Sequence, residues 1–213
     1  EGAVGSADIS IATAYINPAG YALLADELDA SPRVRLLIGA EPEFDADRSL
    51  GNGDNAAEVA LRTALSSHDN WLAAERDMSG FTREAMASAQ SMVDWLERSI
   101  DGTPVVEVRK FPHGFLHGKA YVVETGIGSA AVAGSSNFTQ AGLSKNAELN
   151  LATSGTPGHV TDIKEWFNHY WDQSDEYDLA ALYKSQWAPH QPWPVFVRML
   201  QEMYGTNVGE EAI

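Results

Sequence analysis

The stretch "HGKAYVVETGIGSAAVAGSSN", residues 117–137, contains two strand-like runs separated by a short turn. The turn segment "TGIGS" is rich in glycine and predicts a hairpin between the two runs. Because side chains alternate along a strand, His117 and Lys119 are expected to share one face, while Gly118, Ala120 and Val122 point into the core. A lone His-x-Lys pair is also typical of an ordinary exposed polar face, so the pair by itself assigns no function.

Upstream of this hairpin, the chain begins with a strand–helix–strand pattern. "ADISIATAYI" alternates isoleucine with small polar residues and predicts a strand, and "RVRLLIGA" predicts a second strand. Between them, Asn17 can cap a helix over "NPAGYALLADELDASP", with Pro18 at its first position. Such a unit predicts a parallel pair of strands. Two further strand-like runs, "VVEVRKF" and "NAELNLAT", flank the hairpin along the chain.

The remaining segments indicate one α/β domain over residues 1–175. A loop is expected over 41–55, a helical pattern over 56–100, and an amphipathic helix over "TDIKEWFNHYWDQSD". One side of that helix carries Ile163, Trp166, Phe167 and Tyr170. Residues 176–213 are predicted to be a C-terminal extension or linker, because three prolines cluster there. These are Pro189, Pro192 and Pro194.

The composition is that of a soluble globular protein, with 44% apolar residues and six tryptophans among 213 residues. The chain has no cysteine, which excludes disulfides and thiolate metal sites and fits a reducing compartment, so we expect a cytoplasmic protein. No 18-residue apolar run or signal-peptide pattern argues for membrane insertion. Because the chain begins at Glu1 without an initiator methionine, we expect a processed chain or a piece excised from a longer protein.

The net charge of −16 repels polyanions at long range. Any nucleic-acid site must therefore place its few basic residues locally, in a cleft. Arg109, Lys110 and Lys145 could form such a basic rim or could equally be solvated surface residues.

More polar residues follow the His-x-Lys pair at the ends or polar faces of neighbouring strands. Glu124 ends the first strand of the hairpin, and "GSSN", with Ser135 and Asn137, ends the second. Glu148 lies on the polar face of the strand after that. Cleavage of a phosphodiester needs a nucleophile, a proton for the leaving oxygen, and compensation of the phosphoryl charge. Imidazole, lysine, asparagine and a carboxylate that orients the imidazole can supply these functions.

At this point a family resemblance can be stated. "HGKAYVVE" followed by "GSSN" resembles the H-x-K-x4-D…G-S-x-N signature of the phospholipase D superfamily. Over residues 104–153 the chain is similar to the single-motif nuclease branch and to phospholipase D-like domains attached to helicases. The resemblance implies a phospholipase D-like fold, which is α/β with a mixed, largely parallel sheet sandwiched by helices. "PWPVFVRMLQEMYG" resembles sequences that link such domains to a helicase motor.

Carried over by position, the resemblance implies that His117 is the nucleophile or the acid, and that Lys119 and Asn137 are catalytic phosphate ligands. It implies a supporting substrate contact for Ser135 and an imidazole-orienting role for Glu148. The sequence departs from the family pattern in two ways, at Glu124 and in the spacer that follows it. Glu124, the implied supporting residue, stands where the family usually has aspartate, and the spacer after it is longer, which a larger hairpin could absorb.

The sequence contains one His-x-Lys motif, whereas the family's catalytic unit uses two. The resemblance therefore implies a homodimer in which one His117 forms a phosphohistidine and the other protonates the leaving group. It implies no metal or cofactor. We therefore expect a DNA-cleaving nuclease domain, within a longer helicase-nuclease. Two alternatives stay open: a catalytically silent module that dimerises or positions DNA, and a lipid phosphodiesterase.

Two other features are expected to be structural. His113 and His117 have the spacing of a helical zinc pair, but Pro112 and Gly114 disfavour a helix there and no third ligand follows. We expect His113 to lie in a loop beside the cleft. The aromatic stripe of the helix over "TDIKEWFNHYWDQSD" is expected to form core or dimer interface rather than a base-stacking surface.

Overall fold

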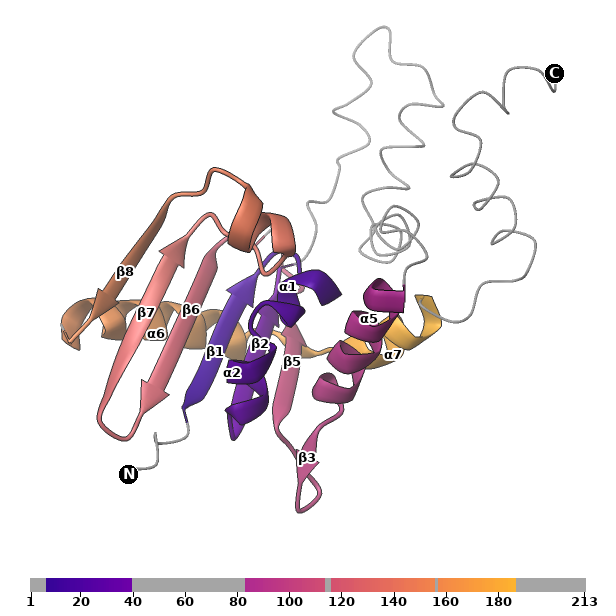
Figure 1. Cartoon of the computed structure of the whole chain (residues 1–213). Coiled ribbons are helices and arrows are strands. Elements are labelled where there is room, and N and C mark those ends of the chain that lie inside the picture. Colours follow the sequence, from indigo (N-terminus) through magenta and orange to yellow (C-terminus); the bar gives the residue numbers. More distant parts are fainter. Residues whose placement is uncertain (1–6, 40–82, 114–115, 156, 187–213) are drawn as a thin grey trace, which may run out of the picture.

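The computed structural model of the chain describes residues 7–39, 83–113, 116–155 and 157–186 (Figure 1). Its strands are β1 (Asp8–Thr13), β2 (Arg33–Ile38), β3 (Ser99–Ile100), β4 (Thr103–Pro104), β5 (Val106–Lys110), β6 (Lys119–Thr125), β7 (Gly128–Gly134), β8 (Asn150–Ser154) and β9 (Asp175–Glu176). Its helices are α1 (Pro18–Ala22), α2 (Ala25–Ala30), α5 (Arg83–Leu96), the π-helix η1 (Ala141–Lys145), α6 (Pro157–Asp172) and α7 (Leu179–Gln186). Apart from the β3–β4 hairpin, the strands form one seven-stranded sheet in the order β8-β7-β6-β1-β2-β5-β9.

The sheet is mixed, with its parallel strands in the centre. β1 pairs in parallel with β2, which confirms the predicted strand–helix–strand start, and β2 pairs in parallel with β5. β6, β7 and β8 extend one side as antiparallel strands, and β9 pairs antiparallel with β5 on the other side. The hairpin predicted at "TGIGS" is the turn between β6 and β7. The predicted α/β class with a mixed sheet between helices is confirmed, and parallel pairing among the described strands is confined to the two central ladders.

Helices cover both faces of the sheet, with α6 on one face and α1, α2 and α5 on the other (Figure 1). Because side chains alternate along a strand, neighbouring residues enter different cores. Ile11 and Leu36 pack with Trp95 of α5, whereas Ala12 and Leu37 pack with the aromatic residues of α6. A sheet buried on both faces favours the nearly continuous apolar run seen in β2.

The helix predicted over "NPAGYALLADELDASP" divides into α1 and α2. Asn17 has extended backbone dihedrals, and its Oδ1 accepts a 2.7 Å hydrogen bond from the amide of Gly20, so the predicted cap and the proline at the first position are confirmed. Tyr21 of α1 and Leu28 of α2 both enter the core, and Leu23 at the break between the two helices is exposed. The range predicted as one helix therefore forms two.

The core extends beyond the boundary predicted at residue 175. Leu179 and Tyr183 of α7 are buried, and the Tyr183 hydroxyl donates a 2.9 Å hydrogen bond to the carbonyl oxygen of Ile16. The predicted extension therefore begins with a core helix, and the rest of it, including the proline cluster and "PWPVFVRMLQEMYG", lies outside the described residues. The predicted loop over 41–55 also lies outside the described residues. So does the first part of the predicted helical region, residues 56–82, whereas its later part contains α5.

The aromatic stripe of α6 lies against the sheet, as expected for a core element. Phe167 is buried, and its ring stacks on that of Trp171 at 5.6 Å between centroids. Ile163, Trp166 and Tyr170 are partly buried around the same cluster. None of the helices in the described ranges is long and apolar enough to cross a membrane.

Candidate active site

The His-x-Lys pair lies where β6 begins, beside the carboxyl end of β1. Lys119 is the first residue of β6 and is only 3% exposed, on the sheet face opposite to Ala120 and Val122. The predicted burial of those two residues is confirmed. His117 precedes the strand and is exposed, so strand alternation does not fix its direction, contrary to the prediction that the pair shares one strand face.

The β6–β7 register brings the "GSSN" segment to Lys119. Lys119 is paired with Gly134, the last residue of β7, and the loop that begins at Ser135 therefore starts beside it. A hydroxyl from β1 holds this loop: Thr13 Oγ1 accepts a 2.9 Å hydrogen bond from the amide of Phe138 and lies 3.5 Å from Asn137 Oδ1. The loop that carries Asn137 is thus connected to the end of β1.

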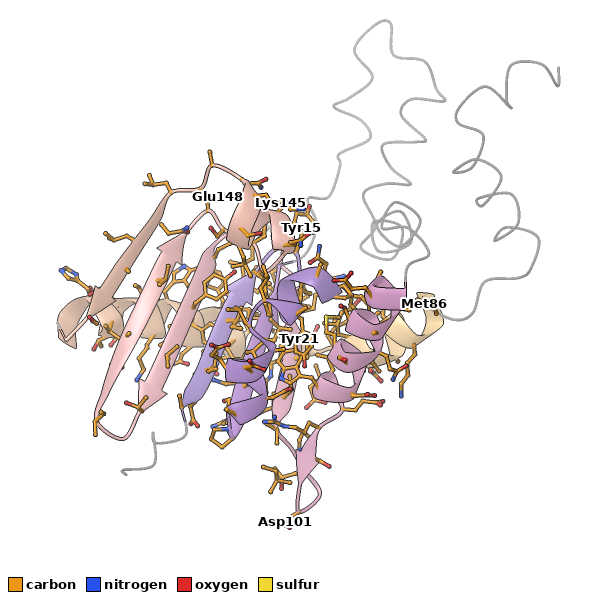
Figure 2. All side chains as sticks on the ribbon, viewed as in Figure 1. Tyr15, Tyr21, Met86, Asp101, Lys145 and Glu148 are labelled. Carbon is orange, nitrogen blue, oxygen red and sulfur yellow. The ribbon has the colours of Figure 1, made fainter. Side chains whose placement is uncertain are left out.

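Glu148 lies at the same end of the sheet, where Figure 2 labels it together with Lys145. Its carboxylate accepts hydrogen bonds from the hydroxyl of Ser135 and, at 3.1 Å, from the side-chain amide of Asn146. β8 lies so close to β7 here that a side chain at Gly134 would collide with Asn150 and with the carbonyl oxygen of Leu149. Four predicted site residues therefore lie with His117 at one end of the strands of the sheet: Lys119, Ser135, Asn137 and Glu148.

The charged groups at this end of the sheet shift one another's pKa values. Burial lowers the pKa of Lys119, and the nearby carboxylate of Glu148 opposes that effect. The pKa of His117 is lowered by burial and then by the positive charge of Lys119. The pKa of Glu148 is lowered by the hydrogen bond from Ser135, then by that from Asn146 and, after these, by the charge of Lys119. This arrangement favours a neutral imidazole beside a positive lysine and a negative carboxylate.

The ammonium group of Lys119 belongs to a largely buried side chain and has the carboxylate of Glu148 nearby. Among the residues that the structure describes, it forms no hydrogen bond or ion pair. A buried charge is costly unless it is paired and hydrogen-bonded. An anion placed beside Lys119 would therefore recover part of that cost.

Glu124 is not brought together with the other predicted site residues. It lies five residues after Lys119, so its side chain leaves the opposite face of β6, and its register partner is Ser129, near the hairpin turn. Its carboxylate forms an ion pair with Lys164 of α6. The contact is structural: it connects α6 to the far end of β6.

The predicted basic rim is dispersed. Arg109 lies over the ring of Trp171 at 4.8 Å and donates to its carbonyl oxygen, and Lys110 lies over the ring of Tyr177 at 5.2 Å. Both belong to β5, which β1 and β2 separate from β6. Lys145 lies at the site edge, where it donates to Gln140.

His113 is an exposed loop residue, as predicted, and its ring meets that of Phe111 edge-on at 5.7 Å. Within the described ranges, no group of three or more histidine, aspartate and glutamate residues could hold a metal ion. The ring of His113 therefore contacts the core through the buried Phe111.

Sequence reasoning missed two supporting residues. Tyr121 donates a 2.9 Å hydrogen bond to the carbonyl oxygen of Ser136, and its burial raises the pKa of its hydroxyl. It lies two residues after Lys119, so strand alternation alone placed it on the same face. Thr13 gives no such signal, because its partner lies 125 residues away.

One family model and two solved structures are similar to this chain. A family model described as "Cardiolipin synthase, PLD-like domain" matches residues 5–171. Among solved structures, the phospholipase D family member Nuc from Salmonella typhimurium is 16% identical, with a TM-score of 0.41 over 81% of this chain and 82% of that chain. NucT from Helicobacter pylori is 12% identical, with a TM-score of 0.43 over 80% of this chain and 82% of that one. No curated protein sequence matches. Since the family model spans most of the 213 residues, the chain belongs to the PLD-like domain family of the phospholipase D superfamily.

Proposed function

We propose that the protein is a metal-independent phosphodiesterase that cleaves DNA through a phosphohistidine intermediate at a homodimeric active site. The observation that supports this most is Lys119, a largely buried cationic side chain that lies two residues from an exposed histidine and forms no hydrogen bond or ion pair with the described residues. A phosphate group supplies the anion that such a cation lacks. Membership of the PLD-like family is consistent with the same chemistry.

In the proposed first step, a ring nitrogen of a neutral His117 attacks phosphorus. A phosphorus–nitrogen bond forms, the phosphorus–oxygen bond to the leaving group breaks, and the leaving oxygen takes a proton from the His117 of the second copy. Lys119 and the amide of Asn137 stabilise the charge on the non-bridging oxygens. Water then attacks phosphorus: a phosphorus–oxygen bond forms, the phosphorus–nitrogen bond to His117 breaks, and a proton of the water goes to the second histidine, which restores both imidazoles and releases the phosphate product.

The directions of the pKa shifts support this division of roles. A lowered pKa keeps more of His117 neutral, and only the neutral imidazole has a lone pair for attack. Glu148 is the proposed carboxylate that orients an imidazole, and the hydrogen bonds from Ser135 and Asn146 keep it ionised for that task.

The second copy is part of the proposal because the reaction needs a separate acid besides the nucleophile. The sequence has one His-x-Lys motif, so one chain supplies the nucleophile but no equivalent acid. Two histidines related by a two-fold axis can share one proton, because protonation of one lowers the pKa of the other. A further helicase domain in a longer chain is proposed only on the resemblance of the linking sequence.

The same chemistry serves a phosphatidyl ester, and the matched family model bears the name of a lipid enzyme. This is the second candidate. DNA is preferred because the segment around His117 and Asn137 resembles the single-motif nuclease branch. The net charge of −16 requires that DNA be bound at a local cationic site such as that of Lys119.

The test is cleavage of plasmid and single-stranded DNA in excess EDTA by the native chain, by His117→Ala and by His113→Ala. We expect cleavage by the native chain and by His113→Ala, which removes a nearby exposed histidine, and none by His117→Ala. Equal cleavage by all three proteins would place the activity elsewhere. Hydrolysis of phosphatidyl esters without cleavage of DNA would select the lipid candidate, and a dimer with neither activity would select a silent module.

A further inference from the structure

Tyr121 connects two of the proposed phosphate ligands. It lies two residues after Lys119 on β6, and its side chain leaves the same face of the sheet. Its hydroxyl donates a 2.9 Å hydrogen bond to the carbonyl oxygen of Ser136, the residue directly before Asn137. Burial and, after it, the charge of Glu148 raise the pKa of Tyr121, so the hydroxyl remains a donor at neutral pH. A side-chain hydrogen bond thus joins the strand of Lys119 to the loop of Asn137.

The backbone on both sides of Asn137 is held by side-chain hydroxyls. The peptide group before Asn137 contains the carbonyl of Ser136, which accepts from Tyr121. The peptide group after it contains the amide of Phe138, which donates to Thr13 at 2.9 Å. Because peptide groups are planar, fixing both of them fixes the two dihedral angles between them and hence the direction in which the Asn137 side chain leaves. Asn137 Oδ1 lies 3.5 Å from the hydroxyl of Thr13, so the NH2 group is at the end of the amide away from Thr13.

Ser136 is also held from β8, independently of Tyr121. Ser136 is 5% exposed, and its Oγ accepts a 2.7 Å hydrogen bond from the side-chain amide of Asn150. The neighbouring Ser135 exchanges hydrogen bonds with the backbone of Leu149, at 3.2 Å through its amide and at 3.0 Å through its hydroxyl. Loss of the Tyr121 hydroxyl should therefore leave the loop attached to β8 and free only the tilt of the peptide group before Asn137.

We propose that Tyr121 is a positioning residue, which aims the side-chain amide of Asn137 at the phosphate that Lys119 binds. The inference rests on the proposed function and adds to it the group that sets the two phosphate ligands relative to each other. Tyr121 itself contacts no reacting atom in this scheme. Charge stabilisation depends on donors that are already aimed at the phosphoryl oxygens before the reaction, so a small change in tilt should be seen in the rate of the chemical step.

The experiment removes one oxygen atom at a time. Tyr121→Phe is the test variant, and Tyr183→Phe is its matched control, because the Tyr183 hydroxyl also donates to a backbone carbonyl at 2.9 Å, that of Ile16. The substrate is the p-nitrophenyl ester of thymidine monophosphate, a chromogenic phosphodiester, assayed in excess EDTA at a temperature where circular dichroism shows each variant folded. The two phosphorothioate diastereomers of the same ester are assayed beside it. Sulfur accepts hydrogen bonds weakly, so each diastereomer weakens the contacts of one non-bridging oxygen.

Asn137→Ala identifies the diastereomer that reports on Asn137. In this variant, the ratio of the oxygen rate to the sulfur rate should fall for the ester whose sulfur replaces the oxygen that Asn137 binds. We expect Tyr121→Phe to lower kcat about tenfold with KM within about twofold of the native value, and to lower that same ratio. Tyr183→Phe should leave kcat within about twofold and both ratios unchanged.

A purely structural role for Tyr121 predicts that Tyr121→Phe slows all three esters equally or not at all, and either result would overturn the inference. Ratios that Asn137→Ala leaves unchanged would remove the phosphate contact of Asn137, and the positioning role with it. In both cases the proposed function stands, because the native chain still hydrolyses the ester. No hydrolysis by the native chain, or equal hydrolysis by His117→Ala, would instead refute the proposed function together with this inference.

Discussion

Replacement of Thr13 with valine removes the hydroxyl that connects the Asn137 loop to the end of β1. The side chain is 1% exposed, and its Oγ1 accepts from the amide of Phe138 at 2.9 Å and donates to the carbonyl oxygen of Tyr15 at 2.7 Å. Valine has nearly the same shape, so packing is kept while both backbone groups lose a partner. The buried amide of Phe138 left unsatisfied costs about 1–3 kcal/mol and the part-buried carbonyl of Tyr15 less, so we expect a loss of about 2 kcal/mol in the free energy of unfolding.

The measurement is urea unfolding followed by far-UV circular dichroism, with Thr13→Ser as the control. Serine keeps the hydroxyl and loses one methyl group, so its cost should stay near 1 kcal/mol. Cleavage by Thr13→Val should also fall under conditions where the variant is fully folded, because Asn137 loses its anchor. A loss below about 0.5 kcal/mol for valine, or equal losses for valine and serine, would refute the assignment of the hydroxyl as the connecting group.

Three further predictions concern the site and its supports. Lys119→Met should abolish cleavage yet raise the free energy of unfolding by about 1 kcal/mol, because a buried charge is replaced by an apolar chain; urea unfolding checks this. In the same variant the pKa of His117 should rise, since a neighbouring cation no longer opposes protonation, and an NMR titration that shows no rise would contradict the electrostatic coupling. Gly20→Ala should cost about 2 kcal/mol or more in urea unfolding, because its β-carbon would lie 2.6 Å from the backbone oxygen of Phe138. Glu124→Gln should cost under about 1 kcal/mol and leave kcat unchanged, because the ion pair is partly exposed and remote from His117; a large fall in kcat would return this residue to the active site.

Local signals predicted much of the fold. The β6–β7 hairpin is encoded by two short runs and a glycine-rich turn, and its register alone brings Gly134 to Lys119. The cap at Asn17 follows from an asparagine before a proline, which satisfies an amide that the first helical turn leaves free. These features were predictable because the interacting residues are close in sequence and the physical rule depends on residue type alone.

Other features depend on tertiary contacts and were not predictable. The position of His117 just before β6 is a matter of where pairing with β1 ends, which alternation does not specify. The segment that contains α7 was predicted to be a linker because prolines follow it. Yet Tyr183 of α7 is buried, and its hydroxyl donates a hydrogen bond to the carbonyl oxygen of Ile16, 167 residues earlier. Glu124 was expected to support the site, although its odd spacing to Lys119 puts it on the opposite face of β6, and no local signal pointed to its partner on α6.

The connection between Thr13 and Phe138 also has a consequence for the order in which the protein becomes competent. A contact that spans 125 residues closes a long loop, and such contacts form late because their entropic cost is met only when other parts are in place. Asn17 adds a second long-range contact, since its backbone amide donates a hydrogen bond to the carbonyl oxygen of Phe138 at 3.1 Å. The amide proton of Phe138 should therefore exchange with solvent only on global unfolding. During synthesis, a chain that has not yet released residue 138 from the ribosome would carry His117 and Lys119 without an assembled site, so the proposed cleavage activity would begin only when folding is complete.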